Sequence, residues 1–257
     1  MPALSGKPTF GAGRMFMTAN ITNPTPARAF VPQSQSIDFK RKVESLFGEN
    51  QLAVEVGAGE MEVSGKVEFG KTNARIFADM IFGVTGTTGS YLEADKESGT
   101  VPGSSTYVIT VANAANFLFD LGVIDVATGV IMARVADGSE VAGVSYSVTT
   151  TGVDKGKYKF AAGDANANKL ISYAYSSSSI GETVSLNNQL MGKTGNFTAV
   201  HVLPWGNQQD MFVLNNCIAG SSGISAKQSG FGSTTLDYMA AVDSTGKLGT
   251  ATFAEAA

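Results

Sequence analysis

The sequence predicts a mainly β protein, an antiparallel β-sandwich or barrel with one flanking helix and an inserted small β-sandwich. Three observations lead to this expectation. Apolar and polar residues alternate with a period of two along much of the chain, which is typical of strands with one buried face. Glycine makes up 30 of the 257 residues, well above the usual ~7%, and supplies many turns. Apolar residues recur convincingly at helical spacing in one segment, 73–83.

The first half of the expected main domain is a meander with one apolar and one charged face. It begins where Ile37, Phe39 and Val43 alternate with charged residues. A glycine-bearing turn follows at 46–51, and it displays Leu46 and Phe47, which makes it a candidate contact for a partner. A short separate strand is expected at 52–56. In the strand after it, 60–69, the apolar set is Met61, Val63, Val67 and Phe69, and the polar set is Glu60, Glu62, Ser64, Lys66 and Glu68.

The helix is expected to cover one end or side of the sheet. Its apolar face contains Ile76 and Met80, Thr72 is the expected N-cap, and Gly83 suits a left-handed stop. The last third of the chain again predicts strands and turns.

An insertion is expected between the two halves of the main domain. Residues 84–105 predict a loop-rich boundary, and short strands separated by turns follow it. That rhythm indicates a small β-sandwich. Its tyrosines either fill the core or form a stacking platform for sugar: Tyr146, Tyr158, Tyr173 and Tyr175.

The expected domain organisation is therefore discontinuous. Five of the seven prolines fall in residues 1–32, which predict an extended arm that either folds over its own core or lies on a neighbouring subunit. Residues 33–83 and 183–257 form the main β domain, and residues 84–182 form the inserted module.

The composition excludes several classes of protein. A hydrophobic fraction of 43% is enough for a core, so global disorder is not expected. A charged fraction of 16% is below the roughly 25% of ordinary domains, so part of the surface is expected to be covered by another molecule. The net charge of −4 argues against a tight grip on nucleic acid. No apolar run has the length of a signal peptide or a membrane helix, so the cytoplasm of the cell that makes the protein is the expected compartment.

The search for catalytic and metal sites in the sequence is negative. With one histidine and one cysteine, the chain holds neither a Cys/His zinc cluster nor an internal disulfide. His201 occupies an alternating strand position and is interpreted as structural, and Cys217 as a small buried hydrophobe. No nucleotide-binding or hydrolase motif occurs. We therefore expect neither enzymatic activity nor a cofactor or metal.

A resemblance to one family rests on the order of several motifs. Residues 35–51 contain a strand and a Leu-Phe-Gly-Glu-Asn-Gln turn, and Ser64-Gly65-Lys66 lies in the strand that follows. Residues 188–192, 211–217 and 236–249 continue the pattern. In this order the motifs resemble the major tail tube proteins of tailed bacteriophages, and 156–173 looks like a module seen in related virion proteins.

The resemblance implies a structural virion protein. Six copies would form a ring, and stacked rings would form a hollow tail tube whose β-barrel lumen passes the genome. The implied partners are other copies of the chain, tail terminator and tail tip or baseplate proteins, and, without specific binding, the tape measure protein and DNA. The same fold occurs in type VI secretion tubes and tail terminators. A terminator, or a decoration or adhesin module that binds carbohydrate, is the alternative.

Two sets of site residues follow from the resemblance combined with the strand pattern. Because DNA must slide without sticking, an acidic lumen is expected. The lumen-facing candidates are Glu60, Glu62, Lys66 and Glu68. The candidates for contacts between subunits or rings are Phe10, Phe16, Leu46, Phe47, Asn50 and Gln51.

Overall fold

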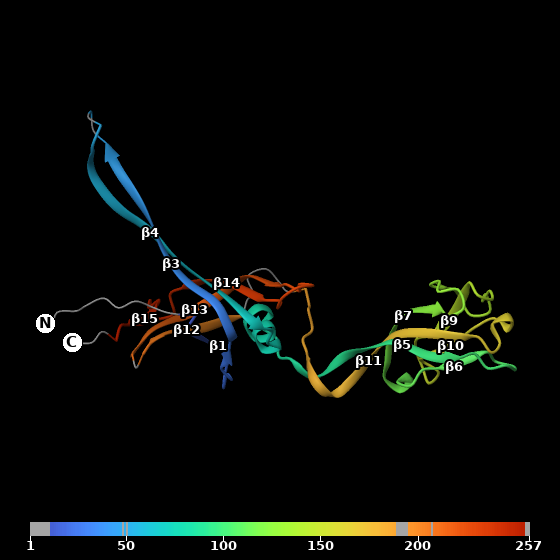
Figure 1. Ribbon diagram of the computed structural model, residues 1–257. Helices are drawn as coiled ribbons and strands as arrows, with labels where there is room; N and C mark the ends of the chain where they lie inside the picture. The colour runs from blue at the N-terminus through green and yellow to red at the C-terminus, as the bar shows by residue number, and fades with distance from the viewer. Residues whose placement is uncertain (1–10, 48, 50, 189–194, 207, 255–257) are drawn as a thin grey trace. The chain divides into compact units, whose positions relative to one another are not determined.

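The computed structural model describes residues 11–47, 49, 51–188, 195–206 and 208–254. It confirms the mainly β fold class, since antiparallel sheets dominate (Figure 1). Contacts divide the chain into two compact units: unit 1 comprises 1–86 with 184–257, and unit 2 comprises 87–183.

Unit 1 is built on an eight-stranded sheet. Its main path is β2-β1-β12-β13-β14-β4-β3. β15 also pairs with β13, over residues 211–214, whereas β14 pairs with residues 216–224 of that strand. The strands are β1 (Arg14–Ala19), β2 (Ala27–Arg28), β3 (Phe30–Phe47), β4 (Ala53–Lys71), β12 (Asn196–Trp205), β13 (Gln208–Ile224), β14 (Thr234–Ala241) and β15 (Gly249–Thr252).

The core of unit 1 lies between one face of this sheet and the helix η1 (Ile76–Phe82). Alternate residues of β4 are buried because the strand period of two turns them to the same face. Ile76 and Met80 of η1 pack into the same cluster, and Gly83 ends the helix with φ 57° and ψ 36°, as expected. The buried residues of β4 are Val63, Gly65, Val67 and Phe69.

The predicted N-cap was wrong. Asn73 Oδ1 accepts the Arg75 N–H at 3.0 Å, whereas the Thr72 hydroxyl bonds the hydroxyl of Thr234 at 2.9 Å. Arg75 itself occupies the N-cap position of η1, with no side-chain cap hydrogen bond.

The expected arm over 1–32 differs from the structure at residues 14–28. These residues form β1 and β2 inside the sheet, and β1 pairs with β12 along its whole length. Met15 and Met17 are fully buried. Three of the five prolines of the segment lie between 24 and 32, outside β1, which is how the proline count misled the prediction.

Unit 2 consists of two sheets around one core. One has the order β6-β10-β9-β8 and the other β5-β11-β7, and buried residues of both belong to one cluster. The strands are β5 (Thr87–Thr100), β6 (Val108–Thr110), β7 (Phe117–Asp125), β8 (Ala133–Arg134), β9 (Ser145–Thr149), β10 (Lys157–Lys159) and β11 (Asn168–Thr183), with short 3₁₀ turns η2 (Ala114–Asn116) and η3 (Ala162–Asp164).

The predicted loop-rich boundary 84–105 was wrong over β5. This strand pairs with β11 from Thr87 to Thr100, interrupted by two register shifts. Its glycine- and serine-containing sequence has low strand propensity, and pairing with a neighbour that is distant in sequence overrides that preference.

The core of unit 2 contains three of the four tyrosines that the sequence left open. Tyr146, Tyr158 and Tyr173 are at most 2% exposed. Asp120 accepts the hydroxyls of Tyr146 and Tyr158 at 2.7 and 2.9 Å, and burial together with this carboxylate raises the pKa of both phenols. These three tyrosines therefore fill the core and offer no stacking platform to a sugar.

Two glycines of β4 give a matched test of the packing. A Cβ added at Gly65 would lie 2.2 Å from the ring of Tyr238, whereas one added at Gly57 would meet nothing within 4 Å. We expect Gly65→Ala to lower the free energy of unfolding of unit 1 by about 1–3 kcal/mol through overpacking. Gly57→Ala should leave it within about 0.5 kcal/mol. Denaturant titration followed by circular dichroism measures both, and equal effects would contradict this packing.

Candidate assembly interface

The β3–β4 hairpin continues beyond the sheet that holds its base. β14 pairs with β4 only over 63–69, yet β3 and β4 remain paired with each other out to Phe47 and Ala53. Figure 1 shows this long ribbon leaving the sheet of unit 1. The described residues of 38–47 and 51–62 are all exposed. A two-stranded hairpin is marginally stable in water, so a projection of this length is unusual for a chain without partners.

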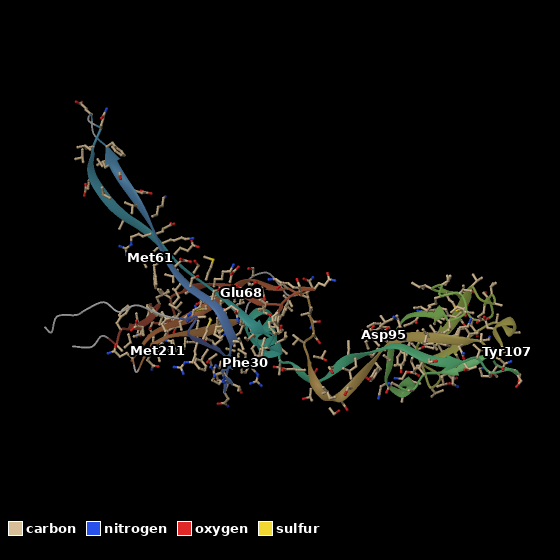
Figure 2. All side chains as sticks on the ribbon, in the orientation of Figure 1. Phe30, Met61, Glu68, Asp95, Tyr107 and Met211 are labelled. Carbon is tan, nitrogen blue, oxygen red and sulfur yellow. The ribbon has the colours of Figure 1, made fainter. Side chains whose placement is uncertain are left out.

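One face of the projecting hairpin is mainly apolar, with Arg41 and Ser45 as its polar members, and it continues the buried face of the sheet. Directly opposed residues share a face, and these pairs include Phe39 with Val63 and Val43 with Ala58. Met61 marks the place where the ribbon leaves the sheet (Figure 2). We call this face the apolar stripe; its large members are 50–61% exposed and comprise Phe39, Val43, Val56 and Met61.

The other face of the hairpin is charged. Lys40 lies opposite Glu62, and Lys66 lies opposite Ser36 on one side and Asp237 on the other. Lys66 Nζ is 3.5 Å from Asp237 Oδ1, and Lys42 Nζ is 2.8 Å from Glu44 Oε1. We call this the charged face; its carboxylates outnumber its lysines, with Asp38, Glu44, Glu62, Glu68 and Asp237 against Lys40, Lys42 and Lys66.

The structure brings the lumen-facing candidates together. Glu62, Lys66 and Glu68 belong to the charged face, which the strand alternation had predicted. Glu60 lies at a β-bulge, because Arg41 pairs with Met61 and Val43 with Ala58. Glu60 is exposed at this bulge, opposite Lys42, where the strict alternation is interrupted.

The contact candidates fall in different places. Leu46 and Phe47 are exposed at the end of the hairpin, and Gln51 is exposed in its turn. Phe16 is half-buried in β1, and the guanidinium of Arg28 lies 5.7 Å from its ring centre, so it has a partner in its own chain. Phe10 and Asn50 lie outside the described residues.

Sequence reasoning missed the length of the hairpin and therefore the exposed apolar residues of its outer part. Val54 and Val56 were assigned to a short separate strand, yet both belong to β4 and are more than 60% exposed. The alternation itself ran through this segment, but a period of two does not show which apolar face is covered.

His201 lies inside unit 1, away from this hairpin tip. It is 1% exposed, its Nδ1 is 2.9 Å from Gln35 Oε1, and its Nε2 bonds the hydroxyl of Tyr238. Burial lowers its pKa to about 4. Cys217 is also fully buried, and burial raises its pKa to about 12. In both cases burial favours the neutral form of the side chain.

Comparison with models of known protein families and with curated proteins found no match. In the part of the chain that the structure describes, no helix is long and apolar enough to cross a membrane. Within the same residues, no group of three or more His, Cys, Asp and Glu side chains is arranged to hold a metal ion.

The buried histidine predicts a pH-dependent stability. The pKa of His201 is about 4 in the folded chain and about 6.5 when unfolded, so the unfolded state gains a proton first as the pH falls. Stability should therefore be full above pH ~6.5 and decline by about 3 kcal/mol toward pH ~4. Because the chain has one histidine, NMR titration of its imidazole measures the folded pKa directly.

The matched variant is His201→Gln, which removes the titration. The difference between the denaturant midpoints at pH 7 and pH 5 should be smaller in this variant than in the natural chain. The carboxylates contribute equally to both chains, so the change in this difference reports on the histidine. An imidazole that titrates near its ordinary pKa would contradict the buried position.

Proposed function

We propose that the protein is a structural subunit that assembles with its own copies into stacked hexameric rings, the tail tube through which a bacteriophage passes its DNA. Its place would be the tail of the virion. The observation that carries the proposal is the apolar stripe on a hairpin that projects from unit 1. The hexameric number and the viral setting come from the family resemblance.

The apolar stripe supplies a driving force for association. Each large apolar side chain contributes about 1.5–3 kcal/mol when it passes from water to a buried site. Phe39, Val43, Val56 and Met61 are half or more exposed in the single chain, so this gain is left for a partner. Leu46 and Phe47 are also exposed at the hairpin end, although Leu46 lies opposite Glu55, on the charged face. Contiguous exposed apolar surface of this kind marks interaction sites.

The edge of the sheet supplies a second route to association. β3 is the outermost strand of the main path in unit 1, and it is 18 residues long. Long open edges invite pairing with another chain, and closing a sheet into a ring removes them. Edge pairing between copies would also let the apolar stripe of one copy be covered by the next.

The charged face suits the inner wall of such a tube. It belongs to β3, β4 and β14, opposite the core face of the same sheet. Its excess of carboxylates repels phosphates. A wall with few basic side chains also makes few of the salt-dependent phosphate contacts that would hold passing DNA. The alternative of a sugar-binding module through the inserted tyrosines is not proposed, because three of these side chains are buried.

Assembly is tested with two valine variants. Val43→Asp places a charge in the apolar stripe, whereas Val153→Asp places one at a fully exposed position of unit 2. We expect the natural chain and Val153→Asp to form stacked rings with a central hole in negative-stain images. Val43→Asp should remain dispersed with an unchanged unfolding midpoint. A natural chain that stays monomeric when concentrated contradicts the proposal, and single rings that never stack would indicate a terminator.

The inner wall is tested by reversing its charge. The double variant Glu62→Lys/Glu68→Lys should form the same tubes but retain DNA in sedimentation at 50 mM salt, and lose it by about 200 mM. The control Glu93→Lys/Glu182→Lys carries the same net change on exposed positions of unit 2. Equal DNA retention by both variants would show that Glu62 and Glu68 do not line the channel.

A further inference from the structure

Unit 2 contains a lysine sealed between two aspartates. Lys169 is 0% exposed, and Asp125 and Asp164 are each 4% exposed. Lys169 Nζ donates to Asp125 Oδ1 at 2.8 Å and to Asp164 Oδ1 at 2.9 Å. It also lies 5.8 Å from the ring centre of Phe160. Fully buried lysines are rare, and this one shares its enclosure with two carboxylates, which leaves one net negative charge inside the unit.

We propose that Lys169 and Asp125 form an intramolecular amide bond, with Asp164 carrying the protons. This inference is independent of the proposed function. The two residues are direct cross-strand partners on β11 and β7, so the bond would tie these strands together side chain to side chain. A nitrogen 2.8 Å from Oδ1 lies no farther than about 4 Å from Cγ, because a carbon–oxygen bond measures about 1.2 Å. Reacting atoms in productive complexes lie about 3–3.5 Å apart, so a small side-chain movement suffices.

The surrounding groups supply what the reaction requires. The Thr128 hydroxyl donates to Asp125 Oδ2 at 2.8 Å, where negative charge would grow as nitrogen attacks Cγ. Asp164 Oδ1 also accepts the Gly143 N–H at 2.9 Å, which orients that carboxylate. Asp164 Oδ2 is buried and has no hydrogen-bond partner among the described residues. Asp164 Oδ1, 2.9 Å from Nζ, is within reach to take a proton from it, and Oδ2 is left without a competing hydrogen bond.

The balance of the step is a condensation. The nitrogen of Lys169 forms a bond to Cγ of Asp125, and the bond from Cγ to Oδ1 breaks. Two protons leave Nζ, pass by way of Asp164 and depart with Oδ1 as one water molecule. Asp164 ends as it began, so an ammonium and a carboxylate become a neutral amide with no oxidant or activating group.

Burial favours this condensation, which is unfavourable in water. In water an amine and a carboxylate remain separate ions, but here the two ions are already desolvated and their amide removes both charges. Held groups react with effective concentrations on the order of 10⁵–10⁸ M. The site has almost no access to solvent. Once the released water has left, hydrolysis of the amide has no water to react with.

Mass spectrometry of the intact full-length chain under denaturing conditions tests the bond. We expect the main species to weigh one water less than the sequence. Lys169→Arg and Asp164→Asn should both restore the full sequence mass. Lys157→Arg, which alters an exposed lysine paired with Asp154, should keep the deficit. A natural chain at full sequence mass overturns the proposal, whether or not any variant folds.

Digestion with trypsin locates the bond and distinguishes it from a cyclic imide, which has the same mass deficit. Asp137 precedes Gly138, and a cyclic imide at that pair would also lose one water. The amide predicts that peptides 97–134 and 160–193 remain joined and that the chain is uncut after Lys169. A deficit confined to the peptide that contains Asp137 would refute the cross-link.

Discussion

β3 and β4 remain paired with each other beyond the point where β14 stops pairing with β4, and the rest of unit 1 depends on this feature. At its base the hairpin is held by β14 and by the core, and Val63, Val67 and Phe69 are buried there. Farther out the same alternation continues, but none of the residues that the structure describes covers it. The sequence thus encodes more apolar surface than one copy buries, and this surplus is what makes self-association the proposed role.

The fold class could be predicted because it depends on local periodicity. The alternation in 60–69 and the helical spacing of Ile76 and Met80 each indicate one apolar face. Both faces are buried in the structure, except that Met61 is 50% exposed. The strand β5 escaped prediction because its register is set by β11, some 80 residues away in the chain. Residues 14–19 escaped because the surrounding prolines dominated the interpretation, although β1 itself contains none.

The candidate interface was predictable in kind but not in extent. The charged residues of β4 were found from their alternation, since pleating alone puts Glu62, Lys66 and Glu68 on one face. The bulge beside Glu60 and the exposure of Val54 and Val56 depend on pairing register and on where β14 ends. The buried trio around Lys169 was not foreseen, because its members come together only when β7 and β11 align.

The ends of unit 2 have a consequence for how such a chain can diversify. Thr87 and Thr183 are paired neighbours on β5 and β11, so the polypeptide enters and leaves this unit side by side. Adjacent strands lie only about 4.8 Å apart, a gap that a tight turn spans. Residues 87–183 can therefore be exchanged for another fold, or for a few residues, without a change in the strand register of the sheet of unit 1.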